Sequence, residues 1–199
     1  MIETKLVLED IKTGKFTGPV LNAVREEVRD HLMSTKRRGM KGLVDYLESS
    51  NFYTSPASTK FHGSYEGGLA VHSLLVYREF DRLASMYAPE LEDNTRKISA
   101  LCHDLCKVDV YHKVESKSGK ELAKPYKFMD EKPLGHGEKS LDIVRDYIQP
   151  TLKEKLLIRW HMGGYDQNYE MNADMIKEKC PELVLLQSAD RIVSAIYDI

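Results

Sequence analysis

Six side chains that can ligate metal ions are spread between residues 72 and 190. They are His72, the adjacent pair His103-Asp104, His136, His161 and Asp190. Neutral imidazoles and carboxylates suit divalent ions of intermediate hardness, such as manganese, iron, nickel or zinc, and carboxylates also suit magnesium. The chemistry that these residue types favour is therefore that of a metal centre.

Six ligands exceed the usual protein complement of one ion, so the set predicts two divalent ions with Asp104 as a bridge. In that arrangement one ion is held by His72, His103 and Asp190, and the other by His136 and His161. A hydroxide between two ions about 3.5 to 4 Å apart is a ready nucleophile, and both ions can stabilise charge on a phosphoryl group. A single ion on His72, His103, Asp104 and Asp190 is the alternative.

The adjacent pair His103-Asp104 requires a particular backbone. Neighbouring side chains on a helix diverge by about 100 degrees, so these two can converge on one ion only at a helix end. Asn94-Thr95 offers a start signal, and the apolar residues that follow at helical spacing are Ile98, Leu101, Cys102 and Leu105. We therefore expect a helix that ends near the pair and runs into a strand over 107–111.

His72 and Asp190 each fall on the apolar stripe of a predicted helix. The stripe that contains His72 consists of Leu69, Val76, Phe80, Leu83 and Tyr87, and that of Asp190 consists of Leu183, Leu186, Val193 and Tyr197. Taken alone, His72 is better explained as a hydrogen-bonded core histidine than as a ligand. An ionised Asp190 costs several kcal/mol to bury without a partner. Because Arg191 points elsewhere on the helix, the two residues together favour a metal.

The remaining two histidines are expected at helix termini. His136 falls in the first turn of a helix that continues through Leu141, Val144 and Ile148. Thr151 and Glu154 have the spacing of a capping box, which starts a helix that ends at His161, before Gly163-Gly164. Glycines beside both histidines let a ligand approach.

The other segments predict a mainly helical chain. Helices are expected from Gly18 to near Ser34 and from about Leu43 to Ser50, while residues 1–17 form a short strand or a loose arm. Alternating side chains after Val108, a turn at 116–120 and a returning segment around Tyr126 predict a β-hairpin over about residues 108–129. The predicted fold class is all-α with a small β-hairpin insertion.

Composition excludes several classes of protein. The chain of 199 residues is 42% hydrophobic and 30% charged, with a net charge of -2, which is typical of a globular domain and does not fit a coat on nucleic acid. It has no apolar run long enough to cross a bilayer and no signal peptide, so a cytoplasmic location is expected. The three cysteines form no disulfide framework; Cys102 and Cys106 either pack in the core or ligate a metal.

The order H, H-D, H, H, D resembles the HD superfamily of metal-dependent phosphohydrolases over about residues 60–195. The stretch from His62 to His72 is similar to the H-x-x-Y-x-G-G-L-x-x-H entry of the bacterial 3′→5′ exoribonucleases that carry an HD domain. The stretch from His103 to Lys107 resembles the family's H-D-x-x-K, and Ala189-Asp190 resembles its terminal A-D.

The resemblance implies an HD-type helical bundle that cleaves a phosphoester by in-line attack of metal-activated hydroxide. Residues 1–199 are then one HD domain, with 1–50 as a helical lead-in and 60–195 as the metal-binding core. Lys107 would hold a phosphate oxygen, and His62 would contact the substrate, protonate the leaving oxygen or fix its loop. Tyr65 and Lys113 are further candidates for binding the substrate.

Three functions fit these expectations. The first is a phosphohydrolase that acts on a nucleotide or a short nucleic-acid 3′ end, either as a phosphodiesterase or as a nucleotidase. The second is a di-iron oxygenase, because some HD proteins use the same scaffold to activate oxygen. The third is a regulatory module that binds metal and nucleotide without turnover. The base, the number of phosphates, the native metal and the oligomeric state are left open by the sequence.

Overall fold

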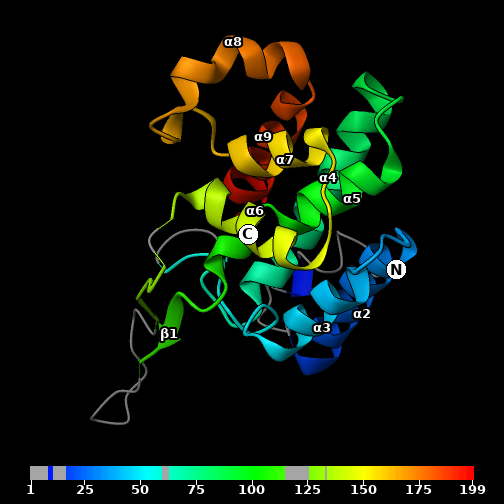
Figure 1. The fold of residues 1–199 in the computed structure, drawn as a ribbon. Coiled ribbons are helices and arrows are strands. Elements are labelled where there is room, and N and C mark those ends of the chain that lie inside the picture. The colour runs from blue at the N-terminus through cyan, green and yellow to red at the C-terminus, as the bar shows by residue number, and fades with distance from the viewer. Residues whose placement is uncertain (1–8, 11–16, 60–62, 115–125, 133) are drawn as a thin grey trace.

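The fold is built almost entirely from helices (Figure 1). The computed structural model describes residues 9–10, 17–59, 63–114, 126–132 and 134–199. Its α-helices are α2 (Gly18–Ser34), α3 (Met40–Ser49), α4 (Gly68–Tyr87), α5 (Asp93–Cys102), α6 (His136–Tyr147), α7 (Leu152–Trp160), α8 (Tyr169–Lys179) and α9 (Leu183–Ile192). Within these residues the only sheet pairs β1 (Tyr111–Lys113) with β2 (Tyr126–Phe128), so the predicted all-α fold with a small hairpin is confirmed.

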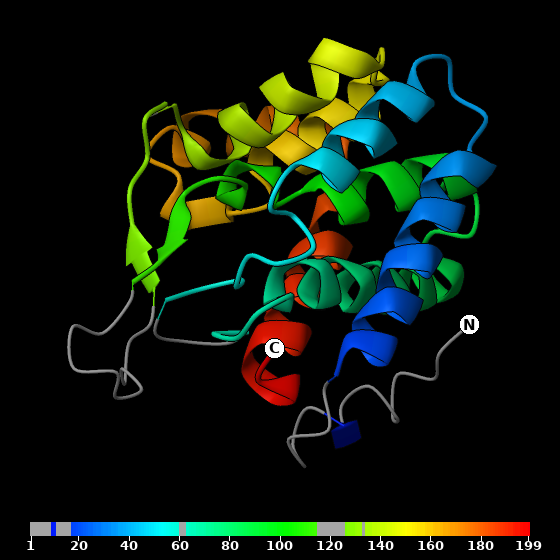
Figure 2. The ribbon, with the colours of Figure 1, turned by 90° about the horizontal axis from the view of Figure 1, so that it is seen from below.

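Helix α4 is the centre of the core, and it crosses the middle of the molecule in Figure 2. It packs against α5, α9 and α2, and both Leu69 and Phe80 on its predicted stripe are fully buried. His72 lies on the same buried face. A polar ring in this position needs partners inside the protein, because burying an unpaired polar group costs free energy.

Three helix ends meet beside α4 and bring the other candidate ligands together. Helix α5 ends at Cys102 with His103 as its C-cap, as the sequence predicts for the adjacent pair. Helix α6 begins at His136, and α7 ends at Trp160 with His161 as its C-cap. Helix α6 packs against α7 and against the 3-10 helix Leu105–Lys107, and α5 packs against α7.

One local expectation is corrected, and one helix has no counterpart in the prediction. The strand predicted for 107–111 begins only at Tyr111, because Asp109 adopts a φ of 58° and donates its backbone N–H to Asn51 Oδ1, which is a turn geometry. Helix α8 was not predicted, since it buries only Ile176 and so shows no apolar stripe.

The structure also bears on the expectations for the cysteines and for the hairpin turn. Cys102 and Cys106 are buried and unpaired by disulfides. The hairpin turn at 116–120 and most of the segment 1–17 lie outside the described residues. Across the ranges that the structure describes, none of the helices has the length and apolar character needed to cross a membrane.

The predicted capping box at the start of α7 is present and is part of a buried ion pair. Thr151 accepts a hydrogen bond from the N–H of Glu154, and Glu154 accepts one from the N–H of Thr151. The Glu154 side chain is completely buried and pairs with Arg37 at 2.8 Å, which fastens the link between α2 and α3 to α7.

Removing the partner of this buried carboxylate should destabilise the protein. We expect Arg37→Ala to lower the free energy of unfolding by about 2 kcal/mol, because the buried Glu154 side chain loses its ion-pair partner. The measurement is urea unfolding followed by circular dichroism. Arg38→Ala, which removes an exposed neighbouring cation, is the control and should change stability by less than about 0.5 kcal/mol. Equal effects of the two substitutions would contradict the role given to the pair.

Candidate metal centre

Asp104 is the point on which the candidate ligands converge. Its side chain is 4% exposed, and its two carboxylate oxygens face different partners. Oδ2 lies 3.5 Å from His72 Nε2, 3.4 Å from His103 Nε2 and 2.7 Å from Lys107 Nζ. Oδ1 lies 2.8 Å from His136 Nε2 and 3.6 Å from His161 Nε2. The carboxylate therefore stands between two sets of imidazoles.

Hydrogen bonds hold three of the histidine rings so that Nε2 faces Asp104. His103 Nδ1 donates to the carbonyl of Ala100 at 2.7 Å, and His161 Nδ1 donates to the carbonyl of Ile158 at 2.8 Å. Both are C-cap residues that reach back to a carbonyl in the last turn of their helix. His72 Nδ1 donates to the carbonyl of residue 199 at 2.9 Å. Because a carbonyl only accepts, each of these rings, in its neutral form, presents Nε2 as its lone-pair atom toward Asp104.

Two of these Nε2 atoms lack a hydrogen-bond partner and could instead bind a cation. The Nε2 atoms of His103 and His161 are buried and have no hydrogen-bond partner among the described residues. An unsatisfied buried polar atom costs about 1 to 3 kcal/mol, which a coordinate bond would offset. Burial lowers the pKa of His103 to about 4, so its ring is neutral near pH 7 and can ligate a metal.

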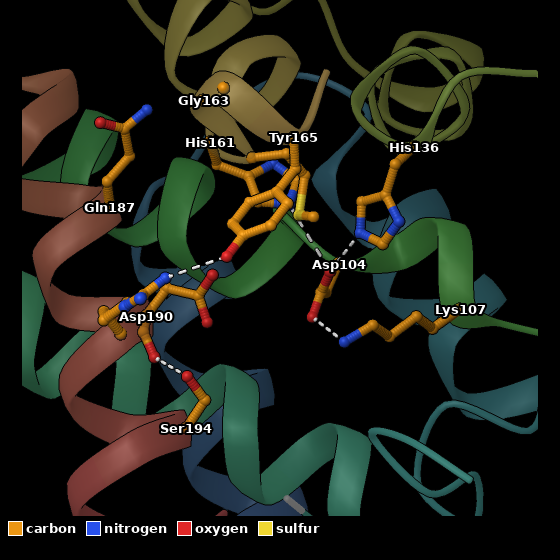
Figure 3. A pocket seen from close by; sticks show the side chains of 12 residues that line it. Asp104, Lys107, His136, His161, Gly163, Tyr165, Gln187, Asp190 and Ser194 are labelled. Carbon is orange, nitrogen blue, oxygen red and sulfur yellow. Dashed lines mark hydrogen bonds and ion pairs between the residues drawn. The ribbon is translucent and has the colours of Figure 1, made fainter. Parts of the chain in front are cut away.

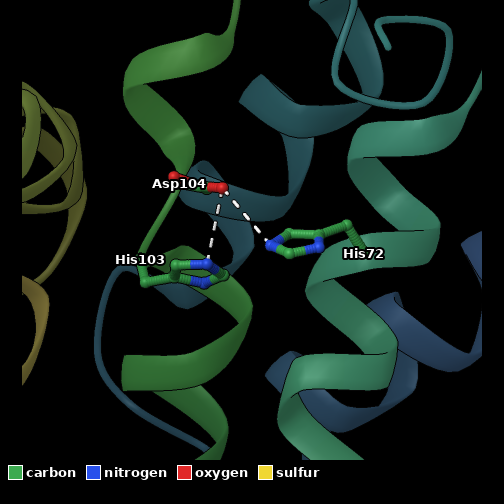
Figure 4. A group of neighbouring side chains, drawn as sticks. All are labelled: His72, His103 and Asp104. Carbon is green, nitrogen blue, oxygen red and sulfur yellow. Dashed lines mark ion pairs between the residues drawn. The ribbon is translucent and has the colours of Figure 1, made fainter. Parts of the chain in front are cut away.

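The structure contains two His/Asp groups that could each hold a metal ion. One is His72, His103 and Asp104, which Figure 4 shows converging from two helices. The other is Asp104, His136 and His161 (Figure 3). Asp104 belongs to both groups, and imidazole nitrogens with a carboxylate are a suitable donor set for a divalent ion. The residues present therefore fit the metal that the sequence pattern implies.

His136 differs from the other three histidines because it is partly exposed and because its Nε2 forms a hydrogen bond with Asp104. Its side chain is 33% exposed, and its Nε2–H donates to Asp104 Oδ1. A metal ion needs a ring nitrogen without a proton, so ligation through Nε2 would require the proton to lie on Nδ1 instead. His136 is the most exposed ligand of the second group.

Asp190 lies beside the first group. Its Oδ1 is 3.2 Å from His72 Nε2. Its side chain is 25% exposed and lines a cavity, whereas the apolar stripe of α9 predicted a place in the core. Burial by itself raises the pKa of Asp190, but the adjacent His72 and His103 lower it by more, so the carboxylate is ionised.

Lys107 is bound to Asp104 in this structure. The partly buried ammonium lies 2.7 Å from Oδ2. Burial alone lowers the pKa of Lys107, but the adjacent Asp104 carboxylate raises it above its ordinary value. Burial likewise raises the pKa of Asp104, and Lys107 and His103 pull it well below its usual range. Both groups are therefore charged near neutral pH.

A cavity of about 640 Å³ opens over this cluster. Asp104, Lys107, His136, His161 and Asp190 line it, together with residues that the sequence interpretation did not select, Met162, Gly163, Gly164, Tyr165, Gln187, Arg191 and Ser194. Arg191 forms no ion pair with Asp190 in the described part of the chain, in line with the expectation that it points elsewhere on the helix, but it lines the same cavity. Helical spacing offered a signal for two others, because Gln187 is three residues before Asp190 and Ser194 is four after it.

The remaining predicted site residues are not gathered in this cavity. His62 lies outside the described residues. Tyr65 is partly buried and packs against the hydrophobic core. Lys113 is exposed on β1, 3.6 Å from Glu66, and lines a different pocket with Asn51 and Tyr126.

The helical fold and the paired His/Asp groups define a class of protein, the helical domains with a histidine-aspartate metal centre. A family model described as HD domain matches residues 69–195, and the chain therefore belongs to the HD-domain family. This family implies a metal-dependent enzyme of the phosphohydrolase type. Comparisons with curated proteins and with solved structures gave no match.

If Asp104 serves two ions, the two groups should be separable by mutation. We expect His136→Ala to lower the metal content from two ions per chain to about one, because the group of His72 and His103 is unchanged. The measurement is elemental analysis of protein purified without chelator or histidine tag. His112→Ala, which changes an exposed hairpin histidine, is the control. Loss of all metal in His136→Ala, or no loss, would contradict two separable groups.

Arg159 holds the elements of the second group together. It pairs with Glu138 in the first turn of α6 and with Asp166 at 2.6 Å, and its guanidinium stacks over Trp160 at 3.8 Å. It thus connects the turn that carries His136 with the end of α7 that carries His161.

We expect Arg159→Gln to weaken the second ion's binding about tenfold and to leave the first ion in place, as loss of an outer-shell partner typically does. Competition with a metallochromic indicator measures both affinities. Arg145→Gln removes an exposed arginine from the same helix as His136 and serves as the control. If both affinities fall together, Arg159 supports the fold as a whole and not the second group.

Proposed function

We propose that the protein is a metal-dependent phosphohydrolase that cleaves a phosphoester of a nucleotide or of a short nucleic-acid 3′ end. The observation that carries the proposal is the shared carboxylate of Asp104, which has imidazoles on both of its oxygens and lies beneath a cavity of about 640 Å³. A cavity of this volume is within the range that holds small organic ligands.

The proposed ligand assignment follows the contacts around Asp104. His72, His103 and Asp190 would hold one divalent ion, and His136 and His161 the other, with Asp104 shared. When bound, such ions activate water and neutralise charge on a phosphoryl group. Manganese, iron, nickel, zinc and magnesium all remain candidates.

The protein's own residues prepare this chemistry by fixing ligands and excluding water. The hydrogen bonds from Nδ1 of His103 and His161 to backbone carbonyls set the ring orientation before any ion arrives. Burial of both rings keeps water away from their ligating nitrogens. Next to the buried ligands, His136, Asp190 and Lys107 each place a partly exposed polar group on the cavity wall, so the substrate would reach Asp104 past them.

Lys107 is the proposed partner of a phosphate oxygen. It lines the cavity next to Asp104 and is cationic near neutral pH. Electrostatic stabilisation of charge in the transition state by a nearby cation is often the largest single contribution to catalysis. His62 remains the proposed source of a proton for the leaving oxygen, and Tyr65 and Lys113 remain proposed substrate contacts.

Exchange of Lys107 tests the proposal. We expect Lys107→Ala to retain its metal and to lose about 100-fold in kcat/KM for phosphoester hydrolysis, because a charge next to the transferred phosphoryl group is missing. The assay is release of p-nitrophenol from bis(p-nitrophenyl) phosphate and of mononucleotides from short oligonucleotides, with manganese added. Lys132→Ala, an exposed lysine outside the cavity, is the control.

The outcomes separate the three candidate functions. Hydrolysis by the wild type that disappears in Asp104→Ala supports the phosphohydrolase. Oxygen uptake by iron-loaded protein without phosphoester cleavage would support the oxygenase instead. Saturable nucleotide binding without any product would support a regulatory module. Wild-type turnover in Lys107→Ala would contradict the role given to that residue.

A further inference from the structure

The cavity has a second wall that takes no part in the proposed metal centre. It consists of Tyr165, Gln187, Arg191 and Ser194, which we call the distal wall. Figure 3 shows Gln187 and Ser194 on the α9 side of the ligand set, with Lys107 on the other side. Helix α9 and the turn that follows it place these side chains next to Asp190. The distal wall therefore faces any substrate whose reacting group lies at Asp104.

Arg191, the cation of the distal wall, forms no close ion pair in the described part of the chain, although the nearby Asp190 carboxylate helps to raise its pKa. In the cavity, the Lys107 ammonium is ion-paired with Asp104 at 2.7 Å. Arg191 is exposed, and within the described residues no carboxylate oxygen lies within 4.0 Å of its guanidinium; its hydrogen bond goes to the hydroxyl of Tyr165 at 3.5 Å. A guanidinium presents a planar fork of donors that matches the oxygens of a phosphate. Arg191 is thus an available anion-binding group at the edge of the cavity.

Tyr165 adds an aromatic surface in a fixed place. Tyr165 is 76% exposed and is the last residue of the 3-10 helix Gly163–Tyr165. Gly163 has a φ of 53°, and a Cβ there would lie 2.8 Å from the Gln187 amide, so the turn runs close against α9. Gln187 in turn donates to the carbonyl of Trp160 at 3.1 Å. A nucleobase can stack on an exposed aromatic ring of this kind.

We propose that the distal wall binds the part of the substrate that is not cleaved: a second phosphate at Arg191 and a base on Tyr165. This inference rests on the proposed function, and it narrows the class of substrates that the phosphohydrolase would accept. The substrate is a nucleotide that carries a further phosphate beyond the ester under attack, such as the phosphorylated end of a short oligonucleotide. Aryl phosphates and nucleoside monophosphates lack the group that Arg191 would bind.

The test compares two thymidine dinucleotides that differ only by a 5′ phosphate. Both carry a phosphorothioate linkage to slow cleavage, and isothermal titration calorimetry measures their Kd for the manganese-loaded protein. We expect the 5′ phosphate to tighten binding about tenfold, as a charge-assisted hydrogen-bond pair does. Arg191→Gln should bring the ratio of the two Kd values to about one. Arg145→Gln, the exposed control outside the cavity, should keep the wild-type ratio.

Tyr165 variants test the stacking contact independently. Tyr165→Leu should weaken binding of both dinucleotides about tenfold, whereas Tyr165→Phe, which keeps the ring, should bind them as the wild type does. A wild-type ratio near one, or an unchanged ratio in Arg191→Gln, overturns the assignment of Arg191. Equal losses in the Leu and Phe variants overturn the stacking role.

This inference and the proposed function can fail separately. Hydrolysis of an unmodified dinucleotide by a protein whose binding ignores the 5′ phosphate would overturn the inference alone. Phosphate-dependent binding that Arg191→Gln abolishes, without hydrolysis under any metal, would support the distal wall and overturn the proposed reaction.

Discussion

The arrangement of the site depends on one buried carboxylate. Asp104 is almost completely enclosed, and its two oxygens are shared between Lys107 and four imidazoles. Burying an ionised aspartate is costly unless its lone pairs are satisfied. Lys107 and His136 at the start of α6 donate to it directly. The rings at the ends of α5 and α7 and on α4 turn Nε2 toward it, and in their neutral form these nitrogens carry lone pairs, so the site calls for bound cations between them and the carboxylate. We infer that the packing of the bundle and the proposed chemistry share the same constraint.

Helix ends are what make the constraint geometrically possible. At a C-cap, His103 and His161 satisfy a carbonyl of their own helix with one ring nitrogen and present the other to Asp104. Asp104 follows directly, where the backbone leaves the helix and has a φ of −106°. Neighbouring residues can therefore act on the same point, which they could not do within a continuous helix. Arg159 then joins the first turn of α6 to the end of α7 behind the second group.

The sequence predicted those parts of the structure that have a periodic or local signal. The buried stripe of α4, the capping box of Thr151 and the helix end at His103 were all predictable, because each depends on residues close in the chain. Helix α8 was not, since it buries almost nothing, and the turn at Asp109 depends on a distant partner, Asn51. The distal wall was missed because the site residues were sought as metal ligands; a cavity also collects side chains such as Arg191 that ligate nothing.

The most direct test of the account is a crystal structure of the manganese-loaded protein with an anomalous difference map. The account predicts two peaks, one contacting Oδ2 of Asp104 on the side of His72 and His103, and one contacting Oδ1 on the side of His136 and His161. A single peak on one oxygen, or peaks away from Asp104, would contradict the claim that this carboxylate serves two ions.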